Sequence, residues 1–216
     1  MKGEQPAVVE ALRMSAVPEG SCDTLLGFLR SYRDAVQMVV NDLWNLDEKL
    51  SRKKLHEAFY NKLRKMGFRA HHVKEVYVYA KSIVESAKSN GSKKPVLRKL
   101  SARVDKYDYR LDPDSMVLVL KLCNDHEVRL KLLAPRGRVE KYREWSNYEL
   151  VVKYDGEEFW VSVYFKRVVK SVKPKTVMAI DLNFDNLTLA VFTLNGRVVK
   201  LKRLRTPLRK MLTHRI

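Results

Sequence analysis

The feature that most constrains the fold of this chain is a change in the spacing of its apolar residues near residues 91–95, Gly-Ser-Lys-Lys-Pro. Before this segment, apolar residues recur at the spacing of one face of a helix. After it, they alternate with polar residues, which is the spacing of a strand. The sequence therefore predicts an α+β protein in which residues 91–95 link a helical part to a β part.

Three helices are expected within residues 21–94. Ser51 is suited to cap the second helix, because its hydroxyl can accept a hydrogen bond from a backbone N–H of the first turn. Gly67 and Gly91 are expected to end the second and third helices, since glycine readily adopts the left-handed conformation found at helix ends. Together these segments predict one helical lobe.

Strands are expected on both sides of this lobe. Residues 7–17 are predicted to form one strand before it. After the linker, the sequence predicts an antiparallel meander of five strands, at 102–111, 116–122, 126–132, 146–154 and 158–166. A lone strand before a helical block is best explained if it joins the later strands in one sheet. We therefore predict an antiparallel β-barrel made of residues 1–20 and 95–173, into which residues 21–94 are inserted.

The charge of the chain indicates a polyanionic partner. Lys and Arg number 43 against 25 Asp and Glu, which leaves a net charge of +18. This charge is far greater than solubility requires, and nucleic acid is the polyanion that such proteins most often bind.

Membrane and zinc proteins are not supported. No apolar run approaches the roughly eighteen residues of a membrane span, and the N-terminal residues lack the apolar segment of a secretory signal. We therefore expect a cytoplasmic protein with no membrane partner. Cys22 and Cys123 stand far apart without the neighbouring Cys or His residues of a zinc site, so neither zinc nor a disulfide framework is expected.

Three groups of basic residues are candidates for contacts with phosphates. The first lies on the second helix, opposite its apolar face: Arg52, Lys53, Lys54, Lys62, Arg64 and Lys65. The second lies in residues 134–145, where basic residues alternate with Tyr142 and Trp145: Arg136, Arg138, Lys141 and Arg143. The third lies in the stretch from Arg197 to the end of the chain, which contains no acidic residue and is expected to be disordered unless phosphates are near: Lys202, Arg203 and Arg205.

The first two groups each have a structural alternative. The basic face of the second helix can be an ordinary solvated face. Residues 134–145 can be a solvated crossover whose aromatic rings fold back onto the sheet. The sequence leaves both interpretations open.

Asp181 is the candidate for metal chemistry. It ends an apolar strand, and a second apolar strand at 187–194, an Asn195-Gly196 hairpin and a third strand follow it. A carboxylate held rigidly at a strand end is a hard oxygen ligand of the kind that Mg²⁺ prefers. The structural alternative is an Asp that ends a strand and caps the following turn.

Residues 178–190, Met-Ala-Ile-Asp-Leu-Asn-Phe-Asp-Asn-Leu-Thr-Leu-Ala, resemble the first RuvC motif of the TnpB-type nucleases of insertion sequences. These proteins are often described as transposases and are related to type V CRISPR effectors. Their order of elements is similar as well, since a wedge-like β-barrel interrupted by a helical recognition lobe precedes an RNase H-like RuvC domain. The resemblance spans essentially the whole chain and places the start of the RuvC domain at 174–216. Asn183 is a departure, because many members have Gly there.

The resemblance implies an RNA-guided DNA endonuclease of transposition, in which the barrel and helices bind guide RNA and DNA by backbone and shape. It makes Asp181 a catalytic ligand in a site that holds two Mg²⁺ ions, which activate water and stabilise the leaving oxygen. The other catalytic carboxylates and the zinc ribbon of that family lie further downstream, and no acidic residue follows Asp185 here. We therefore expect a truncated nuclease that is inactive by itself.

Two other interpretations remain open. The chain can be a non-catalytic module that binds RNA or DNA and regulates a full-length relative. It can also be an actin-like or sugar-kinase ATPase, because that superfamily begins with a similar strand, Asp, turn and strand; the acidic turn after Asp181 and the net charge of +18 disfavour it. Since strands at 176–203 leave an open edge and an uncovered apolar face, we also expect a homodimer through this region.

Overall fold

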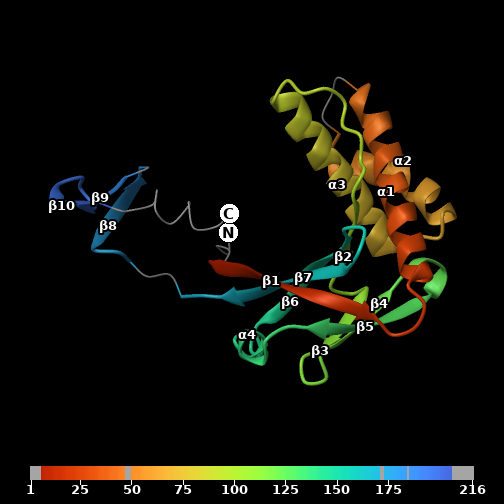
Figure 1. The fold of residues 1–216 in the computed structure, drawn as a ribbon. Helices are drawn as coiled ribbons and strands as arrows, with labels where there is room; N and C mark the ends of the chain where they lie inside the picture. The colour runs from red at the N-terminus through yellow and green to blue at the C-terminus, as the bar shows by residue number, and fades with distance from the viewer. Residues whose placement is uncertain (1–5, 47–49, 171–172, 184, 206–216) are drawn as a thin grey trace. The chain divides into compact units, whose positions relative to one another are not determined.

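The computed structural model describes residues 6–46, 50–170, 173–183 and 185–205. Contacts divide the chain into a large unit, Ala7–Val168, and a small unit that contains the described residues after Val168 (Figure 1). The basic C-terminal stretch was expected to be disordered without phosphates, but residues 198–205 form a strand. Residues 206–216 lie outside the described residues.

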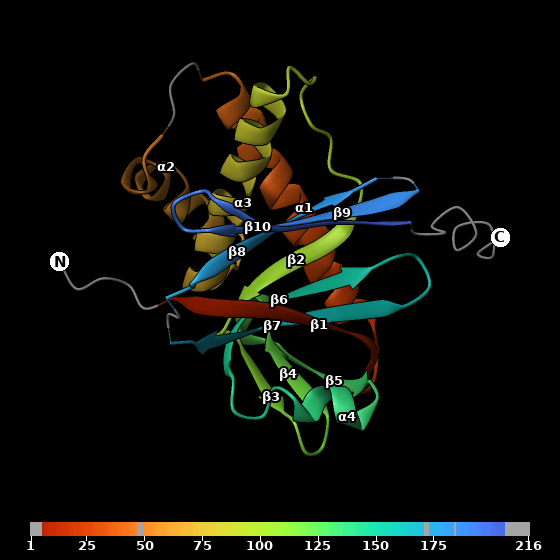
Figure 2. The ribbon, with the colours of Figure 1, turned by 90° about the vertical axis from the view of Figure 1, so that its left-hand side faces the viewer.

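The large unit is built on one sheet of seven strands in the order β2-β6-β7-β1-β5-β4-β3 (Figure 1). The strands are β1 (Ala7–Pro18), β2 (Leu100–Asp105), β3 (Tyr109–Asp112), β4 (Val117–Lys121), β5 (Glu127–Leu133), β6 (Ser146–Tyr154) and β7 (Phe159–Val168). All neighbouring strands are antiparallel. β1 pairs with both β5 and β7 (Figure 2), which confirms that the strand before the helices joins the later strands in one sheet.

The strand predicted at 102–111 is two strands, β2 and β3, separated by residues 106–108. The backbone N–H of Asp108 donates to the carbonyl of Asp105 (2.9 Å), and the carbonyl of Asp108 accepts from the N–H of Lys121 (2.9 Å). The chain thereby leaves β6, the partner of β2, and turns to β4, the partner of β3. No Gly or Pro marks this turn, which is why the sequence predicted a single strand.

The sheet is curled, because its two edge strands are neighbours in sequence. Residues 106–108 connect β2 at one edge to β3 at the other. The connection from Asp105 to Tyr109 spans at most roughly 14 Å, so the edges must approach one another. In the described residues β2 and β3 are not paired with each other, so the closed barrel predicted from the sequence is not found. In a closed barrel, β2 and β3 would be joined by backbone hydrogen bonds, whereas here they are joined only through the short connection of residues 106–108.

The helical lobe follows β1 and precedes β2, and it consists of α1 (Asp23–Trp44), α2 (Arg52–Lys65) and α3 (Ala70–Ser89). Ser51 caps α2 as predicted, because its Oγ accepts a hydrogen bond from the N–H of Lys54 (3.3 Å). Gly67 and Gly91 follow the C-cap residues of α2 and α3, which are Met66 and Asn90, and have φ values of 86° and 62°. The described residues of this unit also form two short helices: η1 (Cys123–Asp125) and α4 (Arg136–Glu140), which lies within the loop expected at 134–145.

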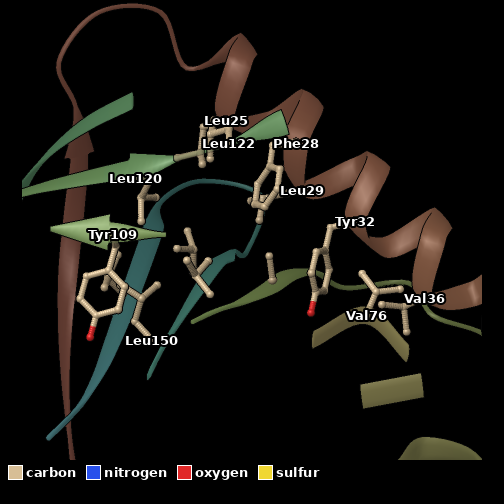
Figure 3. Packing of buried hydrophobic residues seen from close by; sticks show 14 of the residues in the cluster. Leu25, Phe28, Leu29, Tyr32, Val36, Val76, Tyr109, Leu120, Leu122 and Leu150 are labelled. Carbon is tan, nitrogen blue, oxygen red and sulfur yellow. The ribbon is translucent and has the colours of Figure 1, made fainter. Parts of the chain in front are cut away.

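One hydrophobic core joins the helical lobe to the inner face of the sheet (Figure 3). Leu25 and Leu29 of α1 and Leu120 and Leu150 of β4 and β6 are all fully buried in it. Because burial of a leucine side chain stabilises a fold by about 1.5–3 kcal/mol, this shared core fixes α1 against the sheet.

The small unit is a sheet of three antiparallel strands in the order β10-β9-β8. The strands are β8 (Thr176–Leu182), β9 (Asn186–Thr193) and β10 (Val198–Arg205). The hairpin predicted at Asn195-Gly196 joins β9 to β10, and Gly196 has a φ of 85° and donates its N–H to the carbonyl of Thr193 (2.9 Å).

Candidate nucleic-acid interface

Strands β1, β7, β6 and β2 present a largely polar face on the side of the sheet opposite the core, which we call the outer face. Along β1, Leu12, Met14 and Ala16 are buried, whereas Arg13 is exposed. Directly paired residues of antiparallel strands project from the same face, so the register defines the remaining members. The outer face comprises Arg13, Ser15, Ser101, Arg103, Asp105, Glu149, Val151, Lys153, Trp160, Ser162 and Tyr164.

Arg13 and Trp160 form a fixed pair on the outer face. The guanidinium carbon of Arg13 lies 4.2 Å from the centre of the Trp160 ring. The indole Nε1 of Trp160 donates to Oδ2 of Asp155 (2.7 Å), which sets the orientation of the ring. A cation over an indole face gains about 0.5–1 kcal/mol at an exposed site. Arg13 is therefore held in place by a neutral ring that leaves its positive charge available.

Arg103 and Lys153 extend this positive surface across the sheet. The guanidinium carbon of Arg103 lies 4.4 Å from the ring centre of Tyr79 in α3. Lys153 is the cross-strand partner of both Ser101 and Trp160. Within the part of the chain that the structure describes, Arg13, Arg103 and Lys153 form no ion pair with a carboxylate. Beyond ion-pair distance, the charge of Arg103 acts to lower the pKa of Glu75, and that of Lys153 acts to lower the pKa of Asp155.

An acidic row bounds the positive part of the outer face. Asp105 of β2 and Glu149 of β6 are cross-strand partners in this row. Nζ of Lys74 lies 3.5 Å from Oδ2 of Asp105. Burial raises the pKa of the neighbouring Glu75 because it disfavours the charged carboxylate, although the nearby Lys74 opposes this effect. The positive surface is therefore confined to the rows that contain Arg13, Arg103 and Lys153.

A cleft of about 320 Å³ lies where the helical lobe meets β2 and β6. Its wall includes the linker after α3, which Gln37 of α1 holds in place: the side-chain amide donates to the carbonyl of Pro95 (3.2 Å) and accepts from the N–H of Leu97 (2.7 Å). Lys153 belongs both to this wall and to the outer face. The residues that line the cleft are Arg33, Val36, Tyr79, Leu97, Lys99, Ser101 and Lys153.

The basic residues predicted on α2 all lie on its exposed face, but several are engaged within the protein. Lys62 forms an ion pair with Asp42 (3.3 Å). Arg64 donates a hydrogen bond to the carbonyl oxygen of Phe68 (2.5 Å). Lys53 approaches Glu57 at 4.0 Å, and Lys54 also has an interaction within the chain. In the described residues, only Arg52 and Lys65 of this group have no such partner.

The aromatic side chains of residues 134–145 fold back onto the sheet. Tyr142 is buried, and its ring stacks on that of Phe165 with centres 4.5 Å apart. The Tyr142 hydroxyl donates to Oε2 of Glu10 (2.9 Å). Trp145 packs edge-on against Tyr142 and carries the guanidinium of Arg167 over its ring at 4.7 Å. These rings are therefore occupied by the protein itself.

Two of the four basic residues predicted in this segment are neutralised by acids. Lys141 forms an ion pair with Glu10 (2.5 Å), and its hydrogen bond lowers the pKa of the Glu10 carboxyl. Arg143 forms ion pairs with Asp114 (2.5 Å) and Glu140 (2.9 Å). Arg138 is exposed, and the side chain of Arg136 lies outside the described part of the structure.

Asp181 is exposed in β8, an edge strand of the small sheet as described. Its Oδ2 accepts a hydrogen bond from Nδ2 of Asn183 (2.9 Å), and the same nitrogen lies 3.4 Å from Oδ1 of Asn186. Nδ2 of Asn186, which is buried, donates to Oδ1 of Asp185 (3.0 Å). Two asparagine side chains thus link the two carboxylates of this hairpin, and Asn183 orients Asp181.

Two of the three basic residues predicted on β10 share a face of the small sheet with Asp181. Asp181 pairs with Thr188, which in turn pairs with Arg203, so these three lie in one cross-strand row. Arg205, the partner of Asn186, projects from the same face. Lys202 pairs with Leu189 and projects from the opposite face.

The described residues contain no group of three or more His, Cys, Asp or Glu side chains suited to hold a metal ion. Asp181 and Asp185 are the only acidic residues in the described part of the small unit. A site for two Mg²⁺ ions needs several hard oxygen ligands. The residues described here therefore do not complete such a site by themselves.

The sequence alone did not single out the outer face. Alternation marks the outward positions of β6 and β7, including Lys153 and Trp160, and this signal was available. Arg13, however, becomes a neighbour of Trp160 only through the pairing of β1 with β7. Arg103 meets Tyr79 only because α3 packs against β2.

No protein-family model matches this chain. None of the helices in the described residues is long and apolar enough to cross a membrane. Any assignment of function therefore has to rest on the chemistry of the site itself.

Proposed function

We propose that this chain binds RNA and DNA through the outer face of its seven-stranded sheet. The observation that carries this proposal is the way in which its cations are held. Arg13 and Arg103 rest on aromatic rings, and neither they nor Lys153 are paired with acids among the described residues. Phosphate oxygens can supply the ion-pair partners that these side chains lack.

The wider proposal is a nucleic-acid-binding part of an RNA-guided DNA endonuclease of transposon type. Three observations support it: helices α1–α3 are inserted after β1 into an antiparallel sheet, a three-stranded antiparallel unit follows, and Asp181 lies on its first strand. In this proposal the curled sheet corresponds to the wedge-like barrel and the small unit to the start of an RNase H-like RuvC domain. Asp181 would then serve as one Mg²⁺ ligand once other carboxylates complete the site.

A non-catalytic RNA- or DNA-binding regulator is the second candidate. Two observations favour this candidate. The described small unit contains few carboxylates, and those of Asp181 and Asp185 both accept hydrogen bonds from asparagine amides. Binding through the outer face is common to both candidates.

The experiment that tests binding is a titration of the full chain with labelled RNA and DNA over a range of salt concentrations. We expect the logarithm of the affinity to fall linearly with the logarithm of the salt concentration, because each phosphate contact releases counterions. Salt-independent binding, or no binding at low salt, would contradict the proposal.

A further inference from the structure

We infer that the cleft beside the outer face receives an unpaired nucleotide, so that the strand bound there is single-stranded rather than duplex. This inference rests on the proposed function, because it specifies which form of nucleic acid the surface takes.

The walls of the cleft contain groups that complement both parts of a nucleotide, the base and the phosphate. Tyr79 and Leu97 provide aromatic and apolar surface, whereas Lys99 and Lys153 provide positive charge. In the described residues neither lysine forms an ion pair with a carboxylate. A base can stack on an aromatic side chain whatever its identity, and the adjoining phosphate is attracted by the lysines.

The size of the cleft favours an unpaired nucleotide over a duplex. Its volume of about 320 Å³ lies in the range of pockets that enclose one small ligand. In a duplex both faces of each base are covered by the neighbouring base pairs, and only base edges and phosphates remain accessible. One face of the Tyr79 ring carries the guanidinium of Arg103, so a base can stack only on the other face, and only after it has left the stack of the duplex.

The cleft is built before any ligand binds. Gln37 fixes the linker through its hydrogen bonds to Pro95 and Leu97, and this places Leu97 and Lys99 in the wall. Tyr79 is held in contact with Arg103 of β2. Since these groups are already ordered, binding costs little additional conformational entropy.

The cleft and the outer face form one path for a strand. Lys153 lines the cleft and is also the cross-strand partner of Trp160, over whose ring Arg13 lies. A strand whose base enters the cleft can place its next phosphates against Lys153 and Arg13. The outer face thus supplies the backbone contacts and the cleft supplies the base contact.

The first test compares three ligands of the full chain at one salt concentration by fluorescence anisotropy. These are an oligouridine strand, the same strand with abasic positions, and an RNA duplex of equal length. We expect the intact single strand to bind at least about fivefold more tightly than either of the others, because one stacked base contributes a factor of this size.

The second test uses matched variants at Tyr79. Tyr79→Leu should weaken single-strand binding at least about fivefold, whereas Tyr79→Phe, which keeps the ring, should leave it within about twofold. Duplex binding should be similar in both variants. Lys153→Ala removes a partly exposed side chain and is less disruptive to the fold, and it should weaken single-strand binding as well. Circular dichroism checks the fold of each variant.

The outcomes separate this inference from the proposed function. Equal affinity for the three ligands, or an unchanged affinity in both Tyr79→Leu and Lys153→Ala, overturns the inference and leaves nucleic-acid binding standing. Failure to bind any of the ligands at low salt overturns both.

Discussion

His72, in the first turn of α3, forms a fully buried polar pair with Asp108. Nε2 of His72 lies 3.5 Å from Oδ2 of Asp108, and Nε of Arg69 donates to Oδ1 of the same carboxylate (2.9 Å). Burial lowers the pKa of His72 to about 4, because the imidazolium form is poorly solvated there, although the charge of Asp108 opposes this shift. The imidazole is therefore neutral in the folded protein near pH 7.

We predict that His72 makes the fold sensitive to acid. Below a pH of about 6.5 the unfolded chain protonates this histidine and the folded chain does not, so the free energy of unfolding falls until the pH reaches about 4. The loss due to His72 should be about 2 kcal/mol at pH 5 relative to pH 7.5. Urea unfolding at the two pH values measures it.

His72→Phe is the matched variant, since the site already holds Phe28 and Phe68 against the imidazole ring. Its free energy of unfolding should depend less on pH over this interval by the same amount. An equal pH dependence in the wild-type protein and the variant would show that other groups cause the loss.

Gly67 is a second residue whose identity the structure requires. It has a φ of 86°, and a Cβ atom there would collide with the side chain of Asn124. The backbone N–H of Asn124 donates to the carbonyl of Gly67 (3.0 Å). Gly67→Ala should lower the free energy of unfolding by about 2–3 kcal/mol, from backbone strain and the collision together.

Gly91→Ala is its control in the same denaturant titrations. Gly91 also has a positive φ, of 62°, but its Cβ would meet no atom within 4 Å. Its cost should be about 1 kcal/mol, from backbone strain alone. Equal losses in the two variants would mean that the contact with Asn124 contributes nothing.

At the scale of elements, removal of positive charges from the outer face and from α2 should have different effects on the affinity for RNA. Arg13→Ala with Lys153→Ala removes two positive charges from the outer face, and Arg52→Ala with Lys65→Ala removes two from α2. We predict that the outer-face variant loses at least about tenfold in affinity for RNA and that its salt dependence becomes shallower by about two units of slope. The α2 variant should lose less than about threefold. A larger loss of affinity in the α2 variant than in the outer-face variant would indicate that α2 forms the interface.

The small unit exposes a group of apolar side chains on β8 that predicts self-association, although Lys200 and Lys202 of β10 lie on the same face of the sheet. On β8, Met178, Ile180 and Leu182 project from one face and are 56%, 56% and 73% exposed. β8 and β10 each have one unpaired edge in the described sheet. Sedimentation should therefore show a dimer, because burial of this face contributes about 25 cal/mol per Å².

Ile180→Lys should convert this dimer to a monomer by placing a further charge among the apolar side chains of β8, in the cross-strand row that already ends in Lys202. Val177→Lys, on the opposite face of β8, is its control and should leave the dimer intact. A wild-type chain that sediments as a monomer at high concentration would contradict the prediction.

At the scale of the whole molecule, binding and cleavage should be separable. We predict that this polypeptide binds nucleic acid but does not cut it in Mg²⁺, because two metal ions need more carboxylates than Asp181 and Asp185 supply. A labelled DNA incubated with the purified chain measures this directly. Mg²⁺-dependent cleavage that disappears in Asp181→Asn would contradict the prediction.

The sequence by itself determined those features that depend on neighbouring residues. The periodicity of apolar residues predicted the three long helices, the Ser51 cap and most strands, because helix stripes, caps and strand alternation are all local patterns. It missed the turn at 106–108, where no Gly or Pro interrupts the chain, and it therefore joined β2 to β3 as one strand.

The tertiary structure alone decided how the cations of this chain are used. The sequence shows Lys141 and Arg143 only as basic residues, but folding places Glu10 and Asp114 beside them and neutralises them. Arg13 meets Trp160 instead, because β1 pairs with β7. Electrostatic and cation–aromatic contacts depend on distances in space, and residues far apart in the chain acquire those distances only when the strands pair and the sheet curls around its core.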